Sequence, residues 1–162
     1  MVIPFRFASP VRERIRNLMY WLPAAGWMAL IFTGSTGLLS DSRTSRLIEP
    51  VLRWLWPGLA DETVWRLVYL IRKAAHVTEY AVLAVLVLAA LNRTFRLQPA
   101  AWSWRRAGLA LAVCGAYAGS DELHQALEPT RYANAVDVGI DLMGAVLALG
   151  LIWVAGRWRR RW

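Results

Sequence analysis

The sequence predicts an all-α fold: an integral membrane four-helix bundle with an extra amphipathic external helix between the first two transmembrane helices. Of the 162 residues, 57% are hydrophobic, ten are Trp and 19 are Lys or Arg. The basic residues cluster at the ends of apolar runs, as in membrane proteins, and do not form the basic stripe of a nucleic-acid-binding protein. We therefore expect a single membrane domain over residues 1–162 and no nucleic-acid partner.

The first transmembrane helix is expected at about residues 18–33. Four Arg precede it, as in a signal peptide. However, the uncharged stretch 17–40 is long enough to span a membrane, and no A-x-A pattern leads into a soluble domain. We therefore expect this helix to be retained. Pro23 lies inside it, as proline often does in membrane helices.

The extra external helix is expected at residues 45–56, in the long connection after the first transmembrane helix. Apolar residues recur there at helical spacing opposite Arg and Glu, which is typical of an amphipathic helix at a membrane interface. A Pro-Gly pair follows and would end the helix. Asp61 is the expected N-cap of the next helix.

The other three transmembrane helices are expected at about residues 74–91, 107–124 and 137–155. Tryptophans near their ends, such as Trp102 and Trp153, mark the membrane interface. Their longest uncharged stretches hold only 13, 14 and 15 residues. At about 1.5 Å per residue these reach roughly 20–23 Å, short of a hydrocarbon core of about 30 Å. In each helix the missing length is supplied by charged residues at the same end.

The distribution of basic residues predicts the orientation. The two tails and the connection between the second and third transmembrane helices carry twelve cations and one acid, whereas the other side carries seven cations and ten acids. Because positive charge is retained on the cytoplasmic side, both termini are predicted to be cytoplasmic in a multi-pass protein of the cell membrane. The charged helix ends then lie toward the extracytoplasmic side.

These charged helix ends are predicted to form one polar site in the outer leaflet. Charge in lipid is costly, and helical periodicity places the charged residues of each helix on one face, so these faces should turn inward. The small residues Gly144 and Ala148 share a stripe with the acids of the last helix and would let another helix approach closely. The candidates for proton transfer or catalysis are His76, Glu79, Asp121, His124, Asp137 and Asp141, and those for ligand binding are Arg72, Lys73, Tyr80, Glu122, Gln125 and Arg131. Structural ion pairs that tie short helices together are the alternative interpretation.

Two blocks of this region resemble the VanZ-like family. Residues 72–83 (RKAAHVTEYAVL) and 116–125 (AYAGSDELHQ) are similar to its motifs. The matching residues that follow are Pro129, Arg131, Asp137, Asp141, Gly144 and Ala145. The chain departs from the family at Thr130, where Gly is frequent, and the Ser-rich end of the family's first helix is represented here by GSTG at 34–37. The resemblance implies a compact multi-pass membrane protein of the cell envelope; the family is named for a protein tied to teicoplanin resistance, and no defined reaction follows.

Functions from different classes remain open at this point. In a membrane enzyme acting on a lipid or lipid-linked envelope precursor, His76 and His124 would transfer protons. Glu79 and Asp121 would orient them or act as bases, and the basic residues would clamp a phosphate or carboxylate. No Ser-His-Asp spacing, cysteine nucleophile or glycine-rich phosphate loop is present, so no reaction can be assigned. The alternatives are a non-catalytic protein that holds a lipid or a lipophilic antibiotic, and a small transporter, for which four helices without a clear inverted repeat are few.

No cofactor is expected. His76 and Glu79 have the i,i+3 spacing of metal ligands, as do Asp121 and His124, which keeps a metal site open as a minor alternative. Neighbouring cations would compete for the same acids. Cys114 is the one cysteine, so it cannot form an intramolecular disulfide or a thiolate metal site, and we expect it to pack in the interior. The sequence leaves the oligomeric state undetermined.

Overall fold

The computed structural model describes residues 10–35, 41–95, 102–126 and 134–159, and within these ranges the chain forms helices and no strand. The helices are α1 (Pro10–Ser35), α2 (Asp41–Leu55), α3 (Asp61–Thr94), α4 (Trp104–Ala126) and α5 (Ala135–Trp158). The all-α prediction is therefore confirmed. By length and composition, α3 and α5 are apolar enough to cross a membrane among the described helices.

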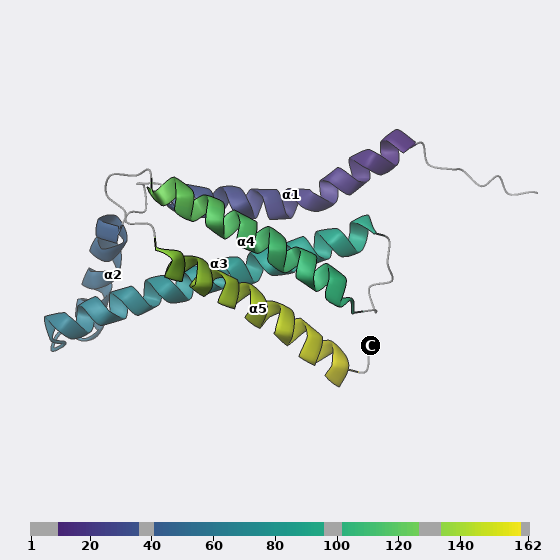
Figure 1. Cartoon of the computed structure of the whole chain (residues 1–162). Coiled ribbons are helices and arrows are strands. Elements are labelled where there is room, and N and C mark those ends of the chain that lie inside the picture. Colours follow the sequence, from purple (N-terminus) through teal and green to yellow (C-terminus); the bar gives the residue numbers. More distant parts are fainter. Residues whose placement is uncertain (1–9, 36–40, 96–101, 127–133, 160–162) are drawn as a thin grey trace, which may run out of the picture.

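Helix α3 is the central element. Its 34 residues span about 51 Å at 1.5 Å per residue, and it packs against each of the other four helices, most extensively against α5. Figure 1 shows α1, α4 and α5 along one part of α3, and α2 beside its first turns. The end of α1, the end of α4 and the start of α5 lie at one end of this arrangement (Figure 1).

Helix α3 begins well before residue 74, where the predicted membrane span starts. Residues before it continue the helix because Val64 and Val68, one turn apart, bury their side chains with Leu52 of α2. The prediction that Asp61 is the N-cap was wrong by one residue. Ala60 occupies that position without a side-chain cap, and Asp61 is the first helical residue.

Helix α2 is amphipathic, as predicted, although it begins at Asp41 and not at residue 45. Its link to α3 is partly electrostatic, because the Arg53 guanidinium lies 2.8 Å from both Glu49 and Asp61. Hydrogen bonds to Asp61 and Glu49 raise the pKa of Arg53. The pairs are exposed, so they fix orientation more than they stabilise the fold.

The interior where α1, α3, α4 and α5 meet is apolar and closely packed. Tyr80, Leu83 and Val87 of α3 are fully buried, as is Cys114 of α4, which confirms the packing role predicted for this cysteine. Facing α3, Gly144 of α5 permits a close backbone approach, because a Cβ added there would lie 2.9 Å from the Cα of Val77.

The outward faces of the helices are also apolar. Leu22 of α1 is 62% exposed and Leu151 of α5 is 69% exposed, and many other large apolar side chains on these helices are similarly open. Soluble proteins rarely expose such extended apolar surface, whereas lipid-facing helices do so as a rule. The outer surface therefore agrees with a membrane protein.

Candidate polar site at the charged helix ends

The first contact of the site joins α3 to α5 through His76 and Asp141. The imidazole Nδ1 lies 3.3 Å from Asp141 Oδ1, an ion-pair distance when the histidine is protonated. Asp141 is 2% exposed, so its carboxylate has little access to solvent. A histidine beside a buried carboxylate is a pair that can exchange a proton with a third group.

One turn earlier on both helices, Lys73 pairs with Asp137. The ammonium Nζ lies 2.5 Å from Asp137 Oδ1, and both side chains are about three-quarters buried. The same ammonium lies 5.4 Å from the ring centroid of Tyr69. The Lys73–Asp137 ion pair and the His76–Asp141 contact therefore hold the same faces of α3 and α5 together, and the phase predicted from the sequence is confirmed for these four residues.

Asp121 of α4 is the third buried acid, and it contacts α1. Its Oδ2 accepts hydrogen bonds from Ser35 Oγ at 2.7 Å and from Gln125 Nε2 at 2.9 Å. All three residues are buried. A buried carboxylate with two donors on one oxygen is fixed in position, and its other oxygen, Oδ1, has no hydrogen-bond partner among the described residues.

Glu122, the acid next to Asp121, makes its hydrogen bond to the backbone at the start of α5. Its Oε2 accepts from the backbone N–H of Asn134 at 2.9 Å. Asn134 is the N-cap of α5, and its side chain accepts from the amide of Val136. Glu122 therefore fixes the start of α5 relative to α4, and its predicted role in ligand binding stays a prediction.

Aromatic groups close the site toward the apolar interior. The Tyr80 and Tyr117 rings lie 6.3 Å apart between α3 and α4. Tyr117 donates to the carbonyl of Met28 at 2.5 Å, and Trp27 donates to the carbonyl of Glu79 at 2.8 Å. These two bonds attach α1 to the helices that carry the acids.

The charges form one cluster and not separate pairs. Asp141 interacts electrostatically with Asp121 on α4 and with Asp137 one turn away. Glu79 interacts with His76, Asp141 and Asp121. The predicted convergence of three charged helix faces is therefore present in the geometry of the described residues.

Three predicted site residues are not among the contacts described so far: His124, Arg72 and Arg131. His124 faces α1, where its ring centroid lies 4.7 Å from that of Phe32. Arg72 is half-buried beside Lys73 on α3. Arg131 lies outside the described residues, so the predicted arginine clamp stays a prediction.

Several buried polar atoms of this cluster have no hydrogen-bond partner among the described residues. They are Tyr80 OH and Asp121 Oδ1, with His124 Nε2 nearby toward α1, whereas His76 Nδ1 and Asp141 Oδ1 face each other at 3.3 Å. Buried polar groups are nearly always hydrogen-bonded, and exceptions concentrate where water or a ligand completes the set. Among the described residues, no three His, Cys, Asp or Glu side chains are arranged to hold a metal ion.

Sequence reasoning missed three residues that build this site: Ser35, Trp27 and Asn134. Ser35 belongs to the GSTG stretch that stands at the Ser-rich position of the family, which was the available signal. In the sequence Trp27 is indistinguishable from other apolar residues, because the role of its indole N–H depends on which carbonyl of α3 lies opposite it. Asn134 precedes an apolar helix and fits the pattern of an N-cap.

Comparison with known proteins gives one match. The model of the VanZ/LLP1 family matches residues 15–156, nearly the whole chain. No curated protein and no solved structure matches the chain.

Proposed function

The chain belongs to the VanZ/LLP1 family and is thus a membrane protein related to the cell envelope, and from this we propose that its buried polar cluster binds or processes the head of a lipid or lipid-linked anionic precursor. We further propose a multi-pass topology in which α1, α3, α4 and α5 cross the membrane with both termini in the cytoplasm. The cluster then lies toward the extracytoplasmic side, at the level of lipid headgroups.

One observation carries the proposal. Acids and bases from α3, α4 and α5 are buried together, and two polar atoms among them, Tyr80 OH and Asp121 Oδ1, lack a partner among the described residues. A set of structural ion pairs would satisfy its own polar atoms, because each unsatisfied buried group costs free energy of about 1–3 kcal/mol. A polar ligand that enters the cluster would supply those partners.

The charges suggest how an anionic head would enter. Lys73 is paired with Asp137 at the more open edge of the cluster, where each side chain retains about a fifth to a quarter of its exposure. A phosphate or carboxylate that approaches this edge would compete with Asp137 for the ammonium. It would thereby come within reach of the adjacent His76–Asp141 pair.

That pair provides the proposed chemistry. His76 would donate or accept a proton at the bound group, while the buried Asp141 carboxylate stabilises the protonated imidazole. Asp121, fixed by Ser35 and Gln125, would present its second oxygen to the same group. A function limited to binding uses the same contacts without the proton transfer.

The proposal predicts which lipids the protein retains. Purified wild type, incubated in detergent with a total lipid extract of the expression host, should retain an anionic or lipid-linked species that mass spectrometry identifies. His76→Ala and Asp121→Asn should lose it while their thermal unfolding stays cooperative. Glu62→Gln, which alters an exposed pair with Arg66, is the matched control and should behave as wild type.

The same experiment separates the classes. Chemical conversion of the retained species that stops in His76→Ala identifies an enzyme, and retention without conversion identifies a binding protein. If His76→Ala and Asp121→Asn retain the same lipids as wild type, or if both simply fail to fold, the charges are structural ion pairs and the proposal is wrong.

A further inference from the structure

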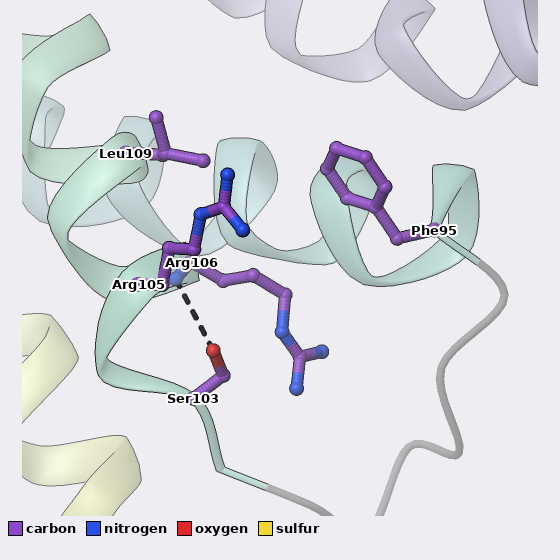
Figure 2. A pocket seen from close by; sticks show the side chains of 5 residues that line it. All are labelled: Phe95, Ser103, Arg105, Arg106 and Leu109. Carbon is purple, nitrogen blue, oxygen red and sulfur yellow. Dashed lines mark hydrogen bonds between the residues drawn. The ribbon is translucent and has the colours of Figure 1, made fainter.

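A second polar feature lies at the opposite end of the helices, where α3 ends and α4 begins. Figure 2 shows a pocket lined by Phe95, Ser103, Arg105, Arg106 and Leu109. Its volume is about 370 Å³. None of these five residues belongs to the acidic cluster, so the pocket is independent of the function proposed above.

The lining is basic and contains no acid. Arg106 is 6% exposed, and its guanidinium donates to the side chain of Asn92 on α3. Its backbone N–H is directed to the hydroxyl of Ser103, which caps the first turn of α4. Arg106 is thus held in place by the fold, whereas Arg105 beside it is exposed on the same turn. A fixed and an accessible guanidinium together suit an anion with several acceptor oxygens.

The backbone reinforces this charge. The pocket is formed at the N-terminal turn of α4, where the helix dipole favours negative charge and the first amides lack intrahelical carbonyls. With the two arginines, that turn makes the pocket a strongly positive site. The planar guanidinium binds carboxylate and phosphate bidentately, and phosphate offers more acceptor oxygens to two guanidinium groups.

The other walls are apolar, and they indicate where the phosphate comes from. Phe95 is 55% exposed and Leu109 is 42% exposed, and both line the pocket. Close by, the ring of Trp104 contacts those of Trp102 and Trp153 at centroid distances of 5.4 and 5.6 Å. Clustered tryptophans are typical of the level of the headgroups in a bilayer. A free anion needs no such surface, whereas a phospholipid buries its acyl chains on it.

We propose that this pocket is a binding site for an anionic phospholipid. Arg105 and Arg106 hold the phosphate, and Phe95 and Leu109 contact the start of the acyl chains. Arg106 also ties α4 to α3, so its replacement would disturb the fold. Arg105 is the residue through which binding can be tested, because no contact between helices depends on its side chain among the described interactions.

The test uses the full-length protein in detergent with phosphatidylglycerol, phosphatidylcholine or inorganic phosphate, and native mass spectrometry to count bound lipid. Wild type should bind phosphatidylglycerol in preference to phosphatidylcholine. Arg105→Gln should weaken phosphatidylglycerol binding by roughly tenfold, as expected for loss of a charge-assisted bidentate contact. Arg157→Gln removes an equal charge from the exposed end of α5 and should change binding little.

A further variant identifies the source of the phosphate. Leu109→Ala should reduce binding of phosphatidylglycerol without affecting any competition by inorganic phosphate. If inorganic phosphate displaces the lipid at equal concentration and Leu109→Ala has no effect, the site binds free anions and the lipid assignment is wrong. Equal losses in Arg105→Gln and Arg157→Gln would show a general surface charge effect and would overturn the site. Because His76 and Asp121 play no part in this pocket, repeating the lipid-extract experiment in the Arg105→Gln background separates lipid held here from lipid held by the acidic cluster.

Discussion

At the scale of single residues, the hydrogen bonds of Asp121 connect the acidic cluster to α1. One oxygen receives two donors, Ser35 from α1 and Gln125 from the next turn of α4. Hydrogen bonds to an ionised group contribute about 1.5–3 kcal/mol each. Ser35 therefore does more than end a helix, because it fixes a buried carboxylate and joins two helices with one contact.

Ser35→Ala should consequently lower the midpoint of thermal unfolding in detergent by several degrees, equivalent to about 1–3 kcal/mol. Ser120→Ala is the control, since Ser120 is exposed and donates only to the carbonyl of Tyr117 on its own helix. Circular dichroism measures both variants. Equal midpoints for the two would mean that the bond from Ser35 to Asp121 contributes nothing to stability.

Among the elements, α3 and α5 make the closest approach. Gly144 faces the backbone of Val77, and any side chain there would meet backbone atoms that cannot rotate away. The Lys73–Asp137 ion pair and the His76–Asp141 contact cross the same interface. The absence of a side chain at Gly144 therefore sets the separation at which these pairs can form.

Gly144→Ala should force α3 and α5 apart and reduce stability by about 1–3 kcal/mol, although Gly→Ala in a helix is otherwise favourable by up to about 1 kcal/mol. Gly150→Ala on the same helix has no atom within 4 Å of the added Cβ and should be neutral or stabilising. Thermal unfolding of the two proteins side by side measures the difference. A Gly144→Ala protein as stable as Gly150→Ala would show that the helices are free to adjust.

Helix positions followed from apolar periodicity, but helix ends did not. The sequence around residues 61–72 is charged enough to look external, and nothing local shows that Val64 and Val68 find a partner in α2. The facing charges were predictable because helical phase is fixed by spacing. Which charged residues pair with each other was not predictable. The choice of Asp137 over Asp141 for Lys73 depends on the axial offset between two helices that are far apart in sequence.

For the molecule as a whole, orientation in the membrane is the property that decides where the acidic cluster acts. The proposed topology places the start of α3 outside and the end of α5 inside. Asp61 has a side chain that is 79% exposed, and Arg159 follows the last turn of α5 on the surface. Both positions are therefore accessible to a reagent from their own side of the membrane.

In a Cys114→Ala background, cysteine at Asp61 should react with a membrane-impermeant maleimide in intact cells, and cysteine at Arg159 should react only after lysis. The wild-type protein, whose Cys114 is fully buried, serves as the unreactive control. Mass-tag shifts on a gel report the labelling. The reverse pattern would invert the protein and place the acidic cluster in the cytoplasmic leaflet.

Helix α3 runs without a break from Asp61 to Thr94, and it carries α2 at one end and the partners of α5 near its middle. In a straight, continuous helix, a small rotation near the middle displaces the end by a larger distance. A tilt of about 10° at the ion pairs would move its tip, some 18 Å away at 1.5 Å per residue, by about 3 Å. If binding in the acidic cluster tilted α3 by this amount, α2 would move with it, and a spectroscopic label on α2 would detect the tilt.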